Sequence, residues 1–263
     1  MFKKYKYPSL ISFFKSFTKV EATYMTFVFA LAIGMAVFFP ELMLESTASP
    51  LLLFCSVCNV IANPLVETMN AKQFRGNFII DIFLIEITYI ILSLHLGWYT
   101  LMLSCIFFWI PIDIISFIQW SKHIDNEDDN LTVVKRLGWK KSIMLLIGCV
   151  VFCLVMGSIM SNMPGSQDSY LEAFATAMGM VNGTLLMLRY SEHWYAWVIT
   201  TILYLAMDIS AGAYGLLIDD VAMLVVTFYG IWKWFKYTKE HNTIQEKIDF
   251  KVKYKILCQK SCL

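Results

Sequence analysis

Long apolar segments alternate with short polar ones along most of this 263-residue chain. A bilayer core about 30 Å thick is crossed by roughly 20 apolar residues, and each such run is helical because lipid offers no partner to an unpaired backbone group. The pattern predicts an all-α membrane protein with eight transmembrane helices. Their expected ranges are Ala22–Phe39, Pro50–Val66, Phe78–Leu96, Trp98–Trp120, Ser142–Ser161, Tyr170–Leu188, Trp194–Ala211 and Tyr214–Phe235.

The 21 lysines and arginines test this count, because positively charged loops of membrane proteins stay in the cytoplasm. With eight spans and a cytoplasmic N-terminus, every basic residue falls on the cytoplasmic side. The segments on the other side, around residues 40–49, 97, 162–169 and 212, carry none. If the count of spans were wrong by one helix, basic residues would fall on both sides of the membrane. We therefore expect both termini in the cytoplasm.

Two stretches about 115 residues apart share a pattern, each with a tyrosine, a glycine at a helical hairpin and a closing Trp-x-Lys. Each stretch covers the second and third helix of a group of three, and the groups start four spans apart, so they run parallel. We predict a parallel 3+1+3 repeat, a SWEET-like arrangement typical of carriers, after one extra N-terminal helix. The matching residues are Tyr89, Gly97 and Trp120 in the first stretch, and Tyr204, Gly212 and Trp234 in the second.

The repeat divides the chain into five parts. Because the loop after residue 121 is acidic and then basic, it is expected to be solvated. The tail after about Glu240 is either disordered or bound to the inner leaflet, and we expect disorder. The parts are an N-terminal segment with the extra helix (1–49), a first bundle (50–120), a cytoplasmic loop with a linker helix (121–169), a second bundle (170–236) and a cytoplasmic tail (237–263).

Composition excludes several other classes of protein. The chain is 58% hydrophobic and only 16% charged, whereas soluble domains carry about 25% charged residues. Its formal net charge of +1 does not fit a globally basic nucleic-acid-binding protein. Most of the seven cysteines lie in expected spans and the rest in the cytoplasmic tail, so no disulfide framework is expected. The pattern predicts no metal and no other cofactor.

Acidic residues inside apolar spans are candidates for a functional site, because a charge within a bilayer is costly. Asp113 and Glu86 lie near mid-membrane, with no lysine or arginine at that depth. They are either protonated and hydrogen-bonded to polar neighbours, or they pair with a positively charged substrate. The neighbours considered are Asn59, Asn63, Thr88 and Asn182.

Further aspartates lie nearer the two membrane faces, Asp81 toward the cytoplasm and Asp208, Asp219 and Asp220 toward the outside. We expect Asp208 and Asp219 to be interfacial residues in contact with water, and we keep Asp220 as a site candidate.

Aromatic side chains in or near the spans form a second set of candidates, because a flat or cationic ligand binds well between their faces. Tyr89 and Tyr204 fall mid-span at matching positions, where ligand contact and hydrogen bonding between helices are both open. Trp194 and Trp197 lie three apart on one helical face, where interfacial anchoring is the alternative. Weaker candidates are Trp109 and Tyr214.

The segment Arg189-Tyr-Ser-Glu192-His-Trp194-Tyr-Ala-Trp197 resembles the PnuC family, bacterial carriers of nicotinamide riboside and related vitamins. Further matches run from about Asn59 to Lys236. They are Asn59-Val60, Gly97-Trp98-Tyr99, Pro111, Trp120-Ser-Lys122-His123, Gly212-Ala-Tyr214 and the closing Gly230, Trp234 and Lys236.

The resemblance implies passive transport through a central site that opens to each side in turn. It places Trp194 and Trp197 in the lining of that site, implies a cytoplasmic kinase that traps the vitamin by phosphorylation, and suggests a homotrimer. The absence of a Gly-x-x-x-x-Gly-Lys-Ser/Thr motif agrees with transport that does not use ATP. The implied location is the cell membrane of a bacterium.

The chain departs from the family pattern where the ligand is expected. Relatives often carry Asn at the position of Cys105, Tyr near Trp109, Gln at Asp113, Asn or Asp at Thr201, and Tyr at Asp220. These differences leave the identity of the substrate open. A cation such as nicotinamide riboside or thiamine suits the added carboxylates, and a neutral (deoxy)nucleoside is the alternative. The expected partners are this small molecule and the lipid bilayer, with no nucleic acid.

The sequence leaves two alternative functions to consider, a proton-coupled symporter and a membrane enzyme. A proton-coupled symporter would use Glu86 or Asp113 as a proton relay. A membrane enzyme is less compatible with the sequence, which has four histidines and neither a His-Glu-x-x-His nor a Gly-x-Ser-x-Gly motif. We expect no enzymatic activity.

Overall fold

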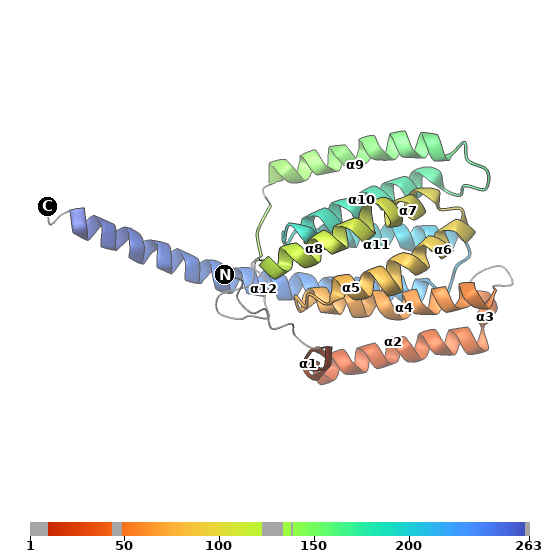
Figure 1. Cartoon of the computed structure of the whole chain (residues 1–263), viewed down its shortest axis with the longest axis horizontal. Helices are drawn as coiled ribbons and strands as arrows, with labels where there is room; N and C mark the ends of the chain where they lie inside the picture. Colours follow the sequence, from red (N-terminus) through yellow and green to blue (C-terminus); the bar gives the residue numbers. More distant parts are fainter. Residues whose placement is uncertain (1–9, 44–48, 123–133, 138, 261–263) are drawn as a thin grey trace.

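The computed structural model describes residues 10–43, 49–122, 134–137 and 139–260, with side chains described as far as residue 240. The described part is helical apart from one isolated bridge between Lys135 and Tyr190. The helices lie side by side in one bundle, from which α12 projects (Figure 1). They are α1 (Leu10–Lys15), α2 (Lys19–Phe38), α3 (Pro40–Met43), α4 (Pro50–Ala71), α5 (Asn77–Asp81), α6 (Ile87–Leu96), α7 (Tyr99–Ser104), α8 (Ile110–Lys122), α9 (Trp139–Met160), α10 (Ser169–Met187), α11 (His193–Ser210) and α12 (Leu217–Lys260).

Two short π-helices join neighbouring α-helices into longer rods. Segment η1 (Ile82–Glu86) connects α5 to α6, and η2 (Cys105–Trp109) connects α7 to α8. Among the described residues, five helical rods are long and apolar enough to cross a membrane: Lys19–Phe38, Pro50–Ala71, Asn77–Leu96, Tyr99–Lys122 and Trp139–Met160. Helices α10, α11 and α12 occupy the other three expected ranges and carry more polar residues, so the count of eight spans stays a prediction.

Glycines form the tight turns at one end of the bundle. Gly97, between α6 and α7, and Gly212, between α11 and α12, have φ values of 72° and 68°, at the two positions where the sequence predicts hairpins. A Cβ atom on Gly97 would lie 2.1 Å from the carbonyl oxygen of Gly165, so the chain also leaves no space for a side chain there. The α6–α7 turn therefore packs directly against the α9–α10 connection.

Helix α3 covers the α11–α12 turn at this same end. The backbone N–H of Gly215 donates to the carbonyl oxygen of Leu42 at 2.7 Å, and a Cβ on Gly215 would meet Met43. Because α3 packs over this turn, the first turn of α12 is buried inside the protein.

The basic end of the bundle, opposite α3, is held together by Glu21. Its carboxylate lies 2.9 Å from Lys72 Nζ and also accepts hydrogen bonds from the backbone N–H of Thr18 and from the Tyr229 hydroxyl. Thr18 and Glu21 form the capping box that starts α2. The peripheral helix α2 is thus tied to the end of α4 and to α12.

Two tryptophans make matching hydrogen bonds across the bundle. The indole N–H of Trp120 on α8 donates to the carbonyl oxygen of Leu186 on α10 at 3.0 Å. That of Trp234 on α12 donates to Asn70 on α4 at 3.1 Å. Helices α4 and α10 both begin at the end where α3 lies (Figure 1). The third helix of each expected group of three therefore contacts the far end of the first helix of the other group.

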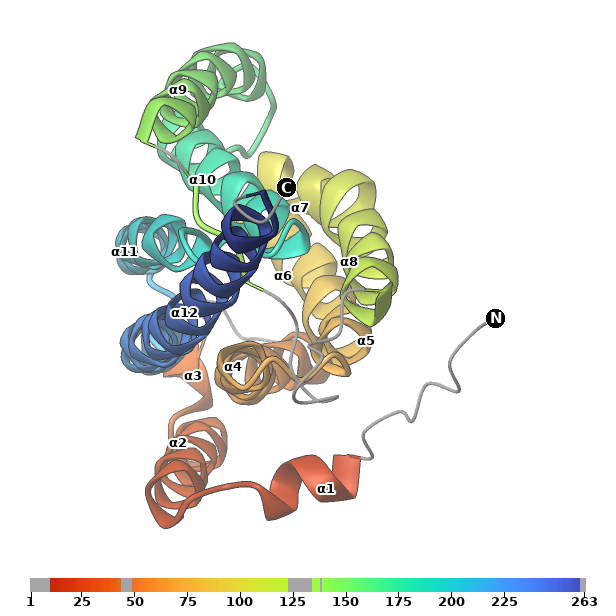
Figure 2. The ribbon, with the colours of Figure 1, turned by 90° about the vertical axis from the view of Figure 1, so that its left-hand side faces the viewer.

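A cluster of rings fills the interior near these bonds. It consists of Phe78, Trp120, Trp194 and Trp234, which we call the aromatic cluster, and each of these side chains is at most 1% exposed. Helices α2 and α9 lie at opposite outer edges of the bundle, α2 beside α4 and α9 beside α10 (Figure 2).

Two expectations about polar segments have different outcomes. Most of the expected cytoplasmic loop, residues 123–133, lies outside the described residues. The tail is helical to Lys260, in contrast to the disorder we expected. Its residues are largely good helix formers, with no glycine or proline after Gly230.

Candidate functional site

A polar chamber lies between the helices α4 to α8 and the helices α10 to α12. Most of the site residues predicted from the sequence line it, on six different helices and on η1 and η2. They are Asn63, Glu86, Tyr89, Trp109, Asp113, Asn182, Trp197, Thr201, Tyr204 and Asp220. The structure thus brings together residues more than 150 positions apart in the chain.

Three predicted site residues lie elsewhere. Asn59 is fully buried, and its amide donates to the Cys55 carbonyl and to the Thr88 hydroxyl, so it joins α4 to α6. Trp194 belongs to the aromatic cluster. Tyr214 is 49% exposed in the turn before α12.

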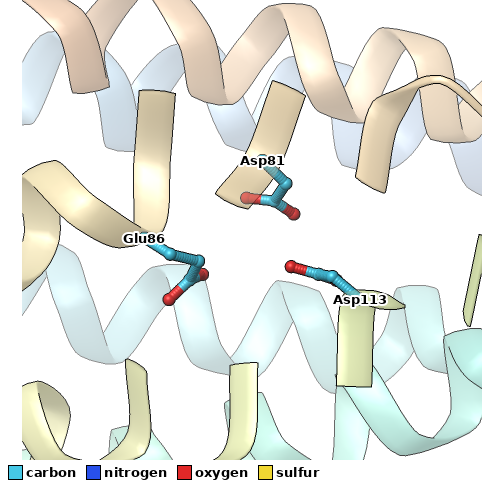
Figure 3. Close-up of side chains that lie close together, drawn as sticks. All are labelled: Asp81, Glu86 and Asp113. Carbon is cyan, nitrogen blue, oxygen red and sulfur yellow. The ribbon is translucent and has the colours of Figure 1, made fainter. Parts of the chain in front are cut away.

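Three carboxyl groups meet on one wall of the chamber (Figure 3). Oxygen atoms of Asp81, Glu86 and Asp113 all lie within 4.8 Å of one another. We call this set the acid triad. Glu86 Oε2 and Asp113 Oδ2 are buried without a hydrogen-bond donor among the described residues, and Cys105 lies in the same lining. Such a set of oxygen atoms suits a cation of any kind, an organic one included, and we assign no metal to it.

The π-helix η1 explains how Asp81 and Glu86 come together. Residues five apart in an α-helix, with 3.6 residues per turn, point in widely different directions. In η1 the N–H of Ile87 bonds the carbonyl oxygen of Ile82, five residues earlier. This wider turn brings residues five apart onto one face, and π-helical turns are frequent at functional sites.

The opposite wall carries a second acidic group. The Asn63 amide donates to Asp219 Oδ2 at 2.7 Å and to the Tyr89 hydroxyl at 3.3 Å. Asp220, the next residue on α12, also lines the chamber, and Asp219 Oδ1 and Asp220 Oδ2 are buried without a partner among the described residues. The expectation that Asp208 and Asp219 are interfacial is wrong: they are 5% and 4% exposed, because the α11–α12 turn is covered by α3.

Aromatic and amide groups complete the lining. The indole of Trp109 packs on Gly179 and Gly183 of α10, since a Cβ on Gly183 would lie 2.7 Å from its ring. Asn182, one residue before Gly183, has its side-chain oxygen 3.2 Å from Nδ1 of the buried His193. The N–H of Trp197 has no partner among the described residues and is free for a ligand or water.

The chamber is small in this conformation. The volume open to water is about 50 Å³. One water needs roughly 10–15 Å³ of such volume, whereas pockets that hold small molecules measure about 300–1,000 Å³. The chamber therefore holds a few waters, and a ligand the size of a nucleoside requires the surrounding helices to move apart.

A family model described as "Nicotinamide mononucleotide transporter" matches residues 53–236, which include every described residue that lines the chamber. The chain belongs to this family. Its curated relatives carry the name PnuC, so the resemblance read from the sequence is confirmed.

Two of these PnuC relatives are named nicotinamide riboside transporters. The protein of Haemophilus influenzae is 23% identical over 144 residues, which cover 53% of this chain and 61% of that protein. The protein of Neisseria mucosa is 22% identical over 238 residues, or 87% of this chain and 86% of that protein. The chain thus matches less than two thirds of the Haemophilus protein but most of the Neisseria protein.

A solved structure shares the fold. The crystal structure of the vitamin B3 transporter PnuC matches with a TM-score of 0.71 at 21% identity, and the match covers 89% of this chain and 100% of that one. The likeness shows that this chain has the all-helical fold of that structure.

The two tryptophans of the PnuC-like motif Trp194-Tyr-Ala-Trp197 lie in different surroundings. Trp194 packs in the aromatic cluster, where its ring fills the space above Gly230, and Trp197 lines the chamber. The sequence predicts that the two residues share one helical face, and this did not distinguish their surroundings.

Sequence reasoning missed several polar lining residues. Glu67 lies one residue beyond the expected end of its span, but α4 continues to Ala71 and buries it. Asp81 was placed near the cytoplasmic face, and the π-helix turns it into the chamber. Cys105 was noted only as a departure from the family pattern, although its neighbour Trp109 was a candidate. The missed polar residues are Glu67, Asn70, Asp81, Cys105 and Asp219.

Proposed function

We propose that this protein is a carrier that moves a ribosylated vitamin, first of all nicotinamide riboside, across the cell membrane of a bacterium by facilitated diffusion. The observation that carries the proposal is the chamber itself. It combines aromatic faces with unpartnered carboxylate oxygens and has no lysine, arginine or histidine among its described lining residues. Such a site suits a flat cation that bears sugar hydroxyls.

The proposed topology has eight spans, with the basic end of the bundle and both termini in the cytoplasm. Helices α4 to α8 form one group of three rods, α10 to α12 form the other, α9 links them and α2 is the extra helix. The matching bonds of Trp120 and Trp234 support a parallel repeat, because each joins corresponding ends of the two groups. Transport sites commonly lie between such repeats near mid-membrane.

The proposed mechanism is alternating access. A volume of about 50 Å³ fits a conformation closed to a nucleoside-sized ligand. Rocking of the two groups would widen the chamber toward one side and then the other. A cytoplasmic kinase would phosphorylate the vitamin and keep it inside, so transport needs no energy source of its own.

The proposed contacts follow the lining. The indole of Trp197 and the ring of Trp109 stack on the vitamin ring, the acid triad pairs with its positive charge, and polar side chains bind the sugar. The proposed polar contacts are Asn63, Tyr89, Asn182, Thr201, Tyr204 and Asp220.

The acidic lining favours cations, which keeps thiamine as the second substrate to consider. A (deoxy)nucleoside would use the carboxylates as acceptors for its hydroxyl and amino groups. Assembly as a homotrimer is proposed from the resemblance alone.

A ligand screen tests the proposal. Thermal shift and calorimetric titration of the purified protein would compare nicotinamide riboside, thiamine, riboflavin and neutral nucleosides. We expect nicotinamide riboside to bind and to raise the melting temperature, followed by thiamine. Binding of riboflavin alone, or of none of these compounds, would contradict the proposed substrate class.

A further inference from the structure

A groove lies on the outside of the bundle, away from the chamber. Among the described helices, α9 packs against α10 and α7 but not against α11, and α10 lies between α9 and α11 (Figure 2). The space between α9 and α11 measures about 310 Å³, with α10 as its floor. Pockets that hold small molecules measure about 300–1,000 Å³. The groove is therefore large enough for a ligand, and it opens toward the surroundings of the bundle.

The groove occupies one half of the membrane thickness. Apart from Leu137, its lining comes from residues 142–149 on α9, 178–185 on α10 and 192–199 at the start of α11. Seven residues of helix rise about 10 Å, and half of a bilayer core measures about 15 Å. These stretches lie next to the basic end of the bundle, where α9 and α11 begin and α10 ends. The groove thus lies within the leaflet at that end.

The polarity along the groove changes in the way that the polarity of a phospholipid does. The polar lining residues Ser142, Glu192 and Tyr195 lie in the first turns of their helices, close to the membrane surface. The deeper lining includes Met178 and Ile199, which are apolar. Polar groups at the surface suit the oxygen atoms of a headgroup, and the apolar side chains suit an acyl chain.

Basic residues surround the mouth of the groove. Arg136 Nε lies 3.9 Å from Glu192 Oε1, so the acidic residue of the described lining faces a positive charge. Lys140 and Lys141 directly precede the first groove residue of α9, are exposed, and form no ion pair within the described part of the chain. Trp139, which is 69% exposed, is of the type that anchors helices at a membrane surface. The two lysines are available for an anionic headgroup.

We propose that the groove binds one anionic glycerophospholipid, with an acyl chain along α10 and the phosphate near Lys140 and Lys141. Basic residues next to a transmembrane helix attract anionic lipids, and basic pockets between helices hold their headgroups. The bound lipid fills the space between α9 and α11, which do not pack on each other, and so attaches the linker helix α9 to the second helix group. The proposal does not depend on which substrate the chamber binds.

Native mass spectrometry and thermal melts of the purified protein test the lipid site. The probe is dioleoyl phosphatidylglycerol, and dioleoyl phosphatidylcholine has the same acyl chains without the net charge. We expect one phosphatidylglycerol to stay bound per chain and to raise the melting temperature, and phosphatidylcholine to bind about tenfold more weakly. Equal retention of the two lipids, or retention of neither, would overturn the proposal.

The headgroup end is tested by the double variant Lys140→Gln/Lys141→Gln. Loss of two lysines next to an anionic headgroup should weaken phosphatidylglycerol binding about 30-fold. Lys15→Gln/Lys19→Gln removes the same charge from exposed positions elsewhere at the basic end and should bind like the wild type. Equal weakening in both double variants would show a general effect of charge and contradict the site.

The acyl-chain end is tested by Ile199→Trp, because the larger indole fills the groove. Ile199 is 42% exposed, and Ile209, which is 53% exposed on the same helix, lies outside the groove. We expect Ile199→Trp to lose bound phosphatidylglycerol and Ile209→Trp to keep it. Unchanged retention by Ile199→Trp would overturn the proposal. If Ile199→Trp instead dissociates an oligomer that forms without bound lipid, a second copy of the chain occupies the groove and the proposal is wrong.

Discussion

The chamber and the aromatic cluster are both buried in the same bundle, but they differ in how their polar groups are satisfied. In the aromatic cluster, the N–H groups of Trp120 and Trp234 donate to backbone carbonyls, and the rings are at most 1% exposed. In the chamber, Glu86, Asp113 and Trp197 keep polar atoms without a partner among the described residues. The Trp194 N–H in the cluster also lacks a partner among the described residues, so the regions differ in what is left unpartnered: one neutral N–H among packed rings in the cluster, and carboxyl oxygens beside open volume in the chamber.

The difference shows that residue type alone does not identify a binding residue. Trp194 and Trp197 belong to one motif and one helix. Trp194 packs against His193 and Trp234, with ring centroids 4.4 and 5.9 Å away, and Trp197 faces the chamber. Substitutions at the two positions should therefore have different effects.

Trp194→Ala should have the largest effect, on stability. Removal of a fully packed indole leaves a cavity, which typically costs about 3–5 kcal/mol for Trp to Ala. We expect a large drop in melting temperature and in the yield of folded protein in detergent. A variant as stable as the wild type would contradict the assignment of Trp194 to the packing core.

Trp197→Ala should keep the fold and weaken the binding of the substrate. Loss of ring stacking and of a cation–π contact amounts to about 1.5–2.5 kcal/mol, or roughly 10- to 100-fold in affinity. Calorimetric titration with nicotinamide riboside would measure the affinity, and a thermal melt would check the fold. If affinity were unchanged, Trp197 would not belong to the binding surface.

Gly183→Ala tests the wall between the two helix groups. The added methyl would lie 2.7 Å from the Trp109 ring, so the ring has to move into the chamber. Crowding of this kind costs about 1–3 kcal/mol, and we expect roughly 3- to 10-fold weaker binding. Gly148→Ala on α9, where no atom lies within 4 Å, is the matched control and should bind normally. Equal binding by both variants would show that Trp109 does not shape the site.

Trp120→Phe should have the smallest effect. It removes the N–H that bonds to Leu186 and keeps an aromatic ring, so the loss should be about 1 kcal/mol of stability. Trp234→Phe should cost a similar amount, because its bond to Asn70 is the counterpart. Thermal melts of the two variants would measure this, and a large difference between them would argue against the parallel repeat.

The sequence predicted the helices well because lipid and a packed interior both demand long apolar runs. It also indicated Asp113 and Glu86, since a carboxyl in such a run is unusual. It missed Asp81, because the 3.6-residue period does not apply across the π-helix η1. It misjudged Asp219, because nothing in the pattern of the chain showed that α3 would cover the start of α12.

The sequence also could not predict that Trp194 and Trp197 have different surroundings. Both face the interior, and only the positions of Gly230 and of the other helices decide that the Trp194 ring is fully enclosed, while the Trp197 ring packs against the cluster and also lines the chamber. Packing between distant segments, rather than local periodicity, determined which aromatic residues line the chamber.

Hydroxyl-radical footprinting with mass spectrometry tests most directly whether the chamber is the substrate site, because it modifies side chains next to internal water. In the free protein, Trp197 and Tyr204 should be modified and Trp194 and Trp234 should not. Saturating nicotinamide riboside should protect the first pair and leave the second unchanged. Modification of Trp197 and Tyr204 that persists at the same rate with bound substrate would contradict this account.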